Sequence, residues 1–289
     1  MGWVEDIQKA IDYMENNLQD KITMESIAKQ ANASVFHFQR TFSVLTDMSV
    51  GEYLRGRRLT LAAQELASTN RKIIDLAYQY GYDTPEAFSK AFRRQHGVKP
   101  SAVRKNIGKL KSYNRLVIQV SLKGAEPMKY KIVERERFQV VGVKREFSLA
   151  LVSDDNFKGI PEFWNDVNAD GTTDRLCKFN NGELQGLLGV CADHQGDTQT
   201  KQIDYWVATE YDGRTPEGFL KFHIPASKWG VFEVHGPMPD AMQQAWNQIV
   251  SEWFPSNKYE HAGTPELEVY SGKDPFSPDM YSEIWIPLK

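Results

Sequence analysis

Two short segments of the sequence place cationic and amide side chains between paired phenylalanines. In the first, Gln39 and Arg40 lie between Phe38 and Phe42, and in the second Lys90 holds the corresponding place between two further phenylalanines. Arginine and glutamine form hydrogen bonds with guanine and adenine edges in the major groove of DNA, whereas lysine pairs with backbone phosphates. The two segments therefore predict contacts with double-stranded DNA.

Both segments fit a helix, a tight turn and a second helix. Ser34 and Thr84 are suited to cap helices over about 35–45 and 85–96, in which phenylalanines four residues apart face inward. This is the helix-turn-helix plan, whose second helix enters the major groove. An amphipathic helix over 49–69 connects the two copies. It spans about 30 Å, close to the ~34 Å between successive major-groove faces.

The side chains expected to meet DNA lie on the sides of the two reading helices that the phenylalanines leave free. Arg40 suits guanine, Gln39 suits adenine or a phosphate, and Phe36 can touch a thymine methyl. Around the second helix the cations suit phosphates, while Glu86 repels them and weakens the expectation of base readout there. The full predicted set is Val35, Phe36, Gln39, Arg40, Ser43, Glu86, Ser89, Lys90, Arg93, Arg94, Lys99 and Arg104.

Two arginines of the connecting helix leave two interpretations open. Arg57 and Arg58 could contact DNA, or they could form internal ion pairs with Glu52, Asp75 or Asp83. We favour the internal ion pairs.

The strings Ser34–Phe42, Tyr53–Leu66 and Ile74–Arg104 resemble the DNA-binding domain of the AraC/XylS family, over about residues 3–106. The resemblance implies an all-α domain with two helix-turn-helix motifs that binds double-stranded DNA, contacts RNA polymerase and usually activates transcription. Asp47 departs from the family, which usually has glycine at this helix end. Because aspartate adopts the left-handed backbone conformation less readily than glycine, we expect slight strain there.

Charge and composition agree with a DNA-binding unit joined to a different one. Residues 1–115 carry a net charge of +6, and residues 116–289 a net charge of −9, as in a nucleic-acid binder with a separate partner domain. No apolar run approaches the roughly 18 residues of a membrane helix, and no signal-peptide pattern begins the chain, so we expect a cytoplasmic protein. The two cysteines match no zinc spacing, and we expect neither metal nor cofactor.

The second half of the sequence has a different and repeated pattern. Two-residue alternation and helical spacing predict an α+β domain over 128–289, built from a duplicated strand–helix–strand–strand unit. Two similar halves of this kind usually meet across a groove where a ligand can bind. A linker over 111–127, with a strand over 116–122, is expected to join this domain to the all-α domain over 1–110.

Residues 128–289 resemble the GyrI-like effector-binding domain, for which the strings Trp229–Val234 and Glu283–Leu288 are the best evidence. The resemblance implies a small-molecule effector as partner. It also implies that a glutamate on the last strand faces an aromatic-lined pocket for lipophilic, often cationic compounds.

The spacing of the last strand agrees with such a pocket. Tyr281, Glu283 and Trp285 share one strand face by the two-residue period. A carboxylate among aromatic rings suits a delocalised cation, through charge attraction and cation–π contact. The predicted effector-binding residues are Phe163, Trp164, Tyr205, Trp206, Tyr281, Glu283 and Trp285.

Other interpretations of this domain stay open. Glu283 could be a partly solvated edge residue, and the aromatic residues could be plain core. The domain could hydrolyse a xenobiotic, with Glu283 as general base beside Tyr205 or Tyr281, or it could bind a protein such as DNA gyrase. Since the sequence shows neither a nucleophile–base pair nor a metal-ligand cluster, we favour a non-enzymatic regulator that binds DNA and responds to a lipophilic molecule.

Overall fold

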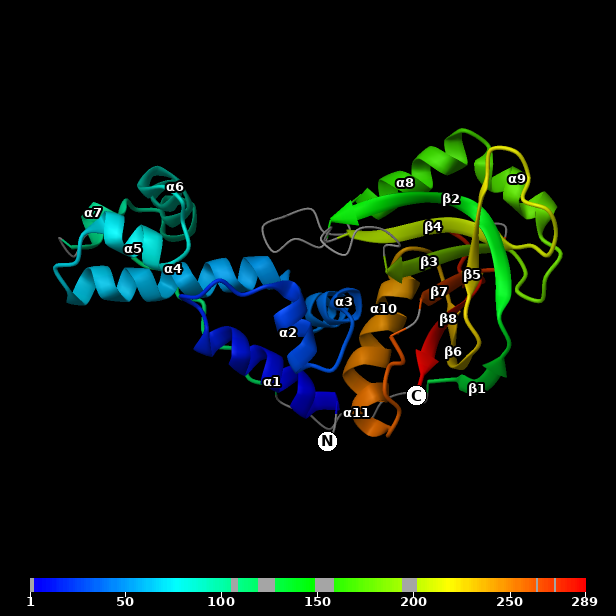
Figure 1. Ribbon diagram of the computed structural model, residues 1–289, viewed down its shortest axis with the longest axis horizontal. Helices are drawn as coiled ribbons and strands as arrows, with labels where there is room; N and C mark the ends of the chain where they lie inside the picture. Colours follow the sequence, from blue (N-terminus) through cyan, green and yellow to red (C-terminus); the bar gives the residue numbers. More distant parts are fainter. Residues whose placement is uncertain are drawn as a thin grey trace. The chain divides into compact units, whose positions relative to one another are not determined.

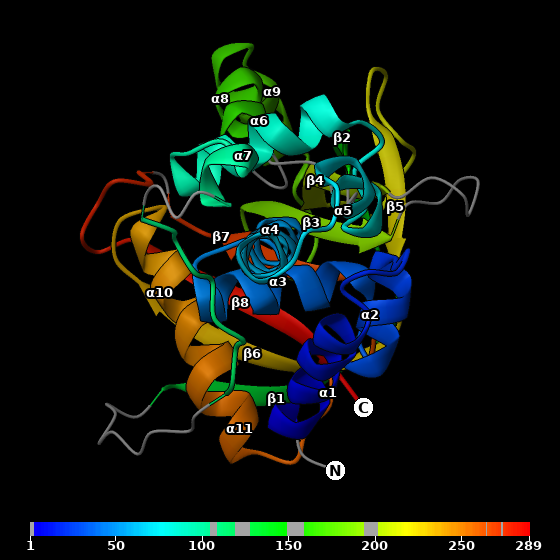
Figure 2. The same ribbon diagram turned by 90° about the vertical axis from the view of Figure 1, so that its left-hand side faces the viewer.

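The computed structural model describes residues 3–104, 109–118, 128–148, 159–193, 202–263, 265–272 and 274–289. They form two compact units, one up to residue 118 and one from residue 128. The first unit is helical, and the second is built on one eight-stranded sheet (Figures 1 and 2). No helix of these residues is long and apolar enough to cross a membrane.

Helix α4 connects two helical halves in the first unit. The helices are α1 (Trp3–Asn16), α2 (Met24–Gln30), α3 (Val35–Thr46), α4 (Val50–Ser68), α5 (Ile73–Gln79), α6 (Pro85–His96) and α7 (Pro100–Val103). The reading helices α3 and α6 and the connecting helix α4 are confirmed, whereas the short α7 was not predicted. The predicted double helix-turn-helix arrangement is therefore present.

Capping residues begin the reading helices where the sequence indicates. Ser34 and Thr84 each accept a hydrogen bond from the third backbone amide of their helix. The paired phenylalanines are buried, as predicted: Phe38, Phe42, Phe88 and Phe92. Phe42 packs with Tyr53 of α4, and Phe88 and Phe92 share a core cluster with side chains of α4. Both reading helices are thus fixed against the same connecting helix.

The two reading helices end in the same backbone conformation but with different residues. Asp47 ends α3 with φ 54° and ψ 24°, and Gly97 ends α6 with φ 75° and ψ −9°. Both are left-handed, so the conformation expected at Asp47 is confirmed. Only glycine adopts it without a steric cost from Cβ.

Residues 109–118, here called the strap, lie along α1 and α4. Their amides bond to side chains, since Leu116 N donates to Tyr53 Oη at 3.2 Å and Ile118 N donates to Gln8 Oε1 at 3.0 Å. The predicted strand over 116–122 is therefore wrong for 116–118, and its remainder lies outside the described residues. Residues 111–118, predicted as linker, belong to the first unit.

The second unit has one antiparallel sheet in the order β1-β6-β8-β7-β3-β4-β2-β5. The strands are β1 (Tyr130–Arg135), β2 (Phe138–Ser148), β3 (Leu187–Asp193), β4 (Gln202–Glu210), β5 (Leu220–Ile224), β6 (Ser227–His235), β7 (Glu266–Tyr270) and β8 (Tyr281–Leu288). The order is symmetric about the β7–β3 pair, with β6, β7 and β8 matching β2, β3 and β4. This symmetry agrees with the predicted duplication. The short β5 was not predicted.

One face of the sheet, here called the concave face, holds the apolar core. Its side chains include Val140, Leu188, Val190, Trp206, Ala208, Phe222, Trp229, Val231, Leu267, Val269 and Trp285. The sheet curls around this core until Arg135 of β1 reaches Glu210 of β4, although four strands lie between them. The Arg135 guanidinium donates to both carboxylate oxygens, at 2.6 and 2.8 Å.

The opposite face, here called the helix face, is covered by helices (Figure 1). They are α8 (Gly159–Ala169), α9 (Thr172–Phe179) and α10 (Asp240–Gln248), which continues through the π-helical turn η1 (Ile249–Trp253) into α11 (Phe254–Ser256). Trp164 of α8 bonds to Tyr205, and Trp253 of η1 meets the Phe232 ring edge-on, with centroids 4.8 Å apart. Helix α9 was not predicted. The helices thus bring aromatic side chains onto this face.

The helix ends give a test of local strain. Replacing Asp47 by glycine is expected to raise the unfolding free energy by about 0.5–1 kcal/mol, because the Cβ penalty disappears. Gly97→Ala is the matched control, for which the unfolding free energy should change in the opposite direction. Nothing lies within 4 Å of the added Cβ, so backbone strain alone should lower the unfolding free energy by about 1 kcal/mol. Urea unfolding of the full chain measures both, and an unchanged Asp47→Gly midpoint would show that Asp47 is unstrained.

Candidate DNA interface and ligand site

Exposure divides the predicted DNA-contacting residues of α3. Val35, Arg40 and Ser43 are partly exposed, whereas Phe36 and Gln39 are buried, with 6% and 4% of their surface exposed. The Arg40 guanidinium lies 5.8 Å from the centre of the Phe36 ring, so Arg40 covers part of a ring on its own helix. Arg40 is the cation among these side chains, and its guanidinium suits a guanine edge.

The second reading helix borders a basic hollow of about 610 Å³. Its walls include Ser89, Lys90, Arg93 and Arg94 of α6 and Lys99, which precedes α7. The four cations are exposed, and among the described residues that line the hollow none is acidic. Such a group of cations fits a phosphate backbone and supplies affinity rather than sequence preference.

Two further predicted residues of this half lie outside the hollow. Glu86 and Arg104 are exposed, but neither is among the walls. Glu86 belongs to the first turn of α6, which also begins with Pro85. Because this end of the helix offers a carboxylate and lacks one amide donor, phosphate contact is favoured at the Lys90 side instead.

Arg57 and Arg58 are used inside the first unit, as we favoured, but with other partners. Arg57 donates to the two carboxylate oxygens of Glu15 at 2.8 and 2.7 Å. Arg58 Nε donates to the Leu18 carbonyl oxygen at 2.6 Å. Glu52, one of the predicted partners, instead accepts the N-cap amide of α4 at 2.8 Å. These arginines therefore hold the helices of the reader together.

The predicted effector-binding residues do not form one site, because strand pairing divides them between the two faces of the sheet. On the concave face lie Trp206, Tyr281, Glu283 and Trp285. On the helix face lie Phe163, Trp164 and Tyr205. Tyr205 is therefore not available as a partner of Glu283 in the hydrolytic mechanism considered above. Phe163 is packed under Arg145, whose guanidinium lies 4.4 Å from the ring centre.

Glu283 is a buried carboxylate with hydrogen bonds on both oxygens. Tyr281 Oη donates to one oxygen and Trp285 Nε1 to the other, both at 2.7 Å, and Lys131 Nζ lies 3.5 Å away. Burial, followed by the hydrogen bond to Glu283, raises the pKa of the Tyr281 phenol. Strand β8 lies between β6 and β7, so Glu283 is not a solvated edge residue.

A second carboxylate, Glu268 of β7, lies among aromatic side chains on the helix face and is only partly buried. Trp246 Nε1 of α10 and Tyr270 Oη donate to its two oxygens, each at 2.9 Å. Trp164 of α8 meets the Tyr270 ring edge-on, with centroids 5.2 Å apart, and its Nε1 donates to Tyr205 Oη at 2.9 Å. Two helices thus each bring a tryptophan to the surroundings of one carboxylate.

Gly189 of β3 makes this grouping possible. A Cβ at this position would collide with the Tyr205 hydroxyl and would lie 3.4 Å from Glu268 Oε2. The tyrosine hydroxyl and the carboxylate are therefore neighbours above a glycine, where β3 of one repeat pairs with β7 of the other. A carboxylate beside several aromatic rings is suited to a delocalised cation.

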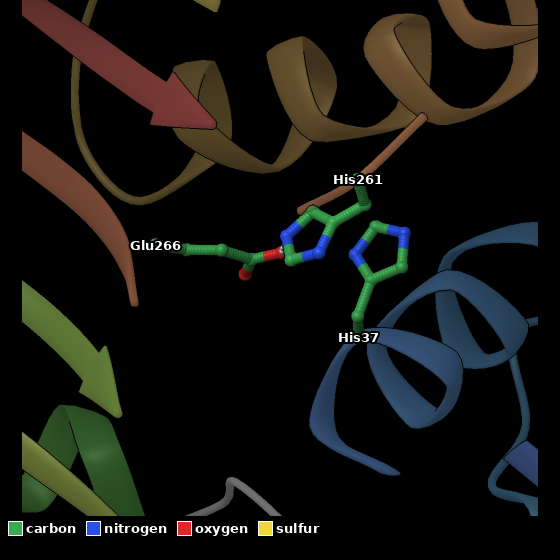
Figure 3. Close-up of side chains that lie close together, drawn as sticks. All are labelled: His37, His261 and Glu266. Atoms are coloured by element: carbon green, nitrogen blue, oxygen red, sulfur yellow. Dashed lines mark ion pairs between the residues drawn. The ribbon is translucent and has the colours of Figure 1, made fainter. Parts of the chain in front are cut away.

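Glu266, two residues earlier on the same face, has a different surrounding (Figure 3). Its Oε1 lies 3.0 Å from His261 Nε2. Gly263 N donates to His261 Nδ1 at 3.0 Å, which assigns the proton of the neutral ring to Nε2, on the side of the carboxylate. Glu266 is buried beside this histidine, whereas Glu268 is partly exposed. Glu268 is therefore the carboxylate of this strand that a ligand can approach.

We did not predict Glu268, Trp246 or Tyr270 as site residues. Part of the signal was present, because the alternation over 266–270 places Glu268 and Tyr270 on one strand face. The position of Trp246 within a helix gave no indication of which strand it would meet. Strand order decides that, and the sequence does not state it.

Comparison with known proteins separates the same two regions. A family model described as integron-associated effector binding protein matches residues 131–288, and one described as helix-turn-helix domain matches residues 27–106. The HTH-type transcriptional activator AarP of Providencia stuartii is 36% identical over 98 residues, which are 34% of this chain and 73% of AarP.

Two further relatives cover more of this chain. The Right origin-binding protein of Escherichia coli K12 is 29% identical over 171 residues, and the match spans 58% of this chain and 58% of that protein. The chain thus spans little more than half the length of that relative. A solved structure of a transcription regulation protein from Staphylococcus aureus MU50 covers 56% of this chain and 99% of its own, with 25% identity and a TM-score of 0.47.

Arg40→Ala is expected to weaken binding to a selected operator by about 1–3 kcal/mol and to relax the preference at one base pair, because a two-bond contact with guanine is lost. Gel-shift titration against the operator and against random duplex measures both affinities. Ser43→Ala, a partly exposed position of the same helix, is the control. Equal losses on both DNAs would mean that Arg40 does not read a base.

Lys90→Ala is expected to weaken binding to all sequences to a similar extent and to reduce the slope of log affinity against log salt by about one, because one phosphate contact disappears. Glu86→Gln, on the same helix, is the control, and removal of this acid should strengthen binding instead. The measurement is a salt series of fluorescence-anisotropy titrations. A slope equal to that of the wild type would remove Lys90 from the phosphate contacts.

Proposed function

This chain belongs to the integron-associated effector binding protein family and carries an AraC-type helix-turn-helix unit, and we propose that it activates transcription when a lipophilic, cationic small molecule binds on the helix face of its sheet. The chain is a transcription regulator, so the proposal concerns its direction, its ligand and its site residues. The observation that carries the proposal is the partly exposed Glu268 carboxylate among Trp164, Tyr205, Trp246 and Tyr270.

DNA binding in this proposal divides between base readout and phosphate contact. Arg40 of α3 reads a base edge, while the basic hollow beside α6 holds a phosphate backbone. Helix α4 has 19 residues, which span about 28 Å, a length that suits two reading helices about one DNA turn apart. One chain therefore supplies both contacts.

Activation rests on the family and on the relatives of the first unit. AarP is named a transcriptional activator, and this chain covers 73% of it. We accordingly propose that the DNA-bound chain contacts RNA polymerase, and that it does so in the cytoplasm, where the DNA lies.

The ligand class follows from the carboxylate and the aromatic side chains that lie together on the helix face. An indole N–H and a phenol O–H donate to Glu268 and orient its carboxylate. Glu268 is partly exposed, whereas Glu283 is buried with the Lys131 ammonium 3.5 Å from one oxygen. A ligand cation at Glu268 gains from charge attraction and from contact with the nearby rings.

Two glutamate variants separate the possible sites. Tetraphenylphosphonium is the cationic probe, and triphenylphosphine oxide is a neutral compound with similar rings. Glu268→Gln keeps the shape and removes the charge, so the affinity for the cation should fall at least about tenfold, because a desolvated cation left without its counter-charge costs several kcal/mol. The affinity for the neutral compound should change little. Calorimetric titration of the full chain measures both, and Glu283→Gln is the matched control.

The pattern of losses decides between the alternatives. Loss of cation affinity in Glu283→Gln with Glu268→Gln unaffected would move the site to the concave face. Equal losses for both ligands in Glu268→Gln would mean that this residue shapes the site without pairing with charge. Failure of the wild type to bind the cation would reject the ligand class.

A further inference from the structure

The strap, residues 109–118, is anchored to the first helical half of the reader. Arg115 Nη2 donates to Asp12 Oδ1 of α1 at 2.8 Å, and the Ile118 amide donates to Gln8 Oε1 at 3.0 Å. The Leu116 amide donates to Tyr53 Oη of α4 at 3.2 Å. Three successive anchors thus hold one end of the strap on α1 and on the start of α4.

The other end of the strap is anchored where α4 meets the second half. The Tyr113 amide donates to Thr60 Oγ1 at 3.0 Å, and Arg57 Nη1 donates to the Tyr113 carbonyl at 2.6 Å. The same Thr60 hydroxyl accepts from Gln95 Nε2 of α6 at 3.3 Å. Gln95 Nε2 also donates to the Gly56 carbonyl at 3.1 Å. The strap therefore reaches from α1 to the residues of α4 that hold the second reading helix.

A charged group links the anchors in the middle. Glu15 of α1 accepts hydrogen bonds from Tyr53 Oη at 2.6 Å and from Arg57 Nε at 2.8 Å, and both donors also touch the strap. Burial alone would raise the pKa of Glu15, but the bonds from Arg57 and Tyr53 hold it below its ordinary value. Glu15 therefore stays charged near neutral pH and keeps Arg57 and Tyr53 oriented toward the strap.

Gly56 leaves the space in which the strap packs against α4. The Tyr113 ring lies directly against this glycine, and a Cβ there would be 2.8 Å from Tyr113 Cγ and 2.9 Å from Cδ1. Glycine in a helix interior costs roughly 1 kcal/mol relative to alanine. Its presence in the middle of α4 is explained by this contact, because any larger residue would push the ring away.

We propose that the strap is a positioning element for DNA recognition, which fixes the rotational phase of the two reading helices. A long helix can curve, so packing against α4 sets the separation of α3 and α6 more firmly than their rotational phase. The strap adds a second connection beside α4, from α1 to the Thr60–Gln95 contact. This inference rests on the proposed DNA binding by both halves of one chain.

Spacing variants of an operator test the proposal. The probes are a duplex selected from random DNA by the full wild-type chain, and the same duplex with one base pair inserted between its two contacted major-groove segments. The insertion turns one segment by about 34° relative to the other, so the wild type should lose at least about tenfold in affinity. Gly56→Ala, which displaces the Tyr113 ring, should lose less than about threefold, because freed halves can follow the altered phase.

Three controls make the result specific. Gly56→Ala with Tyr113→Ala removes the clashing ring and should restore the wild-type sensitivity to the insertion. Gln64→Ala, on the exposed side of α4, should behave as the wild type. Hydrogen exchange at the Tyr113 and Leu116 amides reports release of the strap. If exchange stays slow in Gly56→Ala, a different variant is used to release the strap. Tyr53→Phe combined with Thr60→Val removes the side-chain acceptors of both amides.

The outcomes separate this proposal from the proposed function. A released strap with unchanged sensitivity to the inserted base pair would overturn the positioning role. Restored sensitivity in the double variant together with reduced sensitivity in Gly56→Ala would support it. If the wild type instead contacts one major-groove segment only, two-site reading itself fails, and the positioning role fails with it.

Discussion

One helix has to hold two DNA-reading helices at a fixed separation, and the first unit is organised around that requirement. The paired phenylalanines of α3 and α6 both pack with side chains of α4. Its Arg57 and Arg58 are turned inward, toward Glu15 and the Leu18 carbonyl. Exposed cations of α6 and Lys99 line the basic hollow, where a phosphate backbone can be met without disturbing the packing.

In the second unit the symmetry of the sheet explains why two neighbouring glutamates have different surroundings. The pairing of β3 with β7 sets Gly189 opposite Glu268 and Cys191 opposite Glu266. Where the opposite residue is glycine, the Tyr205 hydroxyl fits beside the carboxylate, and α8 and α10 supply tryptophans. Where it is cysteine, the glutamate is buried beside His261. A duplicated framework thus places the partly exposed Glu268 at its centre.

The repeated carboxylates that the sequence does reveal each lie beside a lysine. Asp204 and Glu283 hold matching positions in β4 and β8, each two residues before a tryptophan on the concave face. Lys144 Nζ lies 2.8 Å from Asp204 and Lys131 Nζ lies 3.5 Å from Glu283. Their neighbours Trp206 and Trp285 belong to the core. The two-residue period correctly placed Tyr281, Glu283 and Trp285 on one strand face, and in the structure that face is the core face of the sheet.

Local features of the fold were predictable, whereas features set by long-range pairing were not. Caps such as Ser34 and Thr84 and the inward phenylalanines depend on neighbours within one turn of helix, so the sequence indicates them directly. The strap was predicted as linker and strand, because its amides bond to side chains of helices far away in the sequence. The partners of Arg57 and the aromatic surroundings of Glu268 likewise depend on which elements become neighbours.

The most direct test of the account is methylation protection of guanines in the major groove by the wild-type chain on an operator that it selects. The account predicts two protected clusters about one helical turn apart on the same side of the duplex, with one chain bound per operator. A single protected cluster, or two chains for two clusters, would contradict the claim that one chain reads two successive major-groove segments.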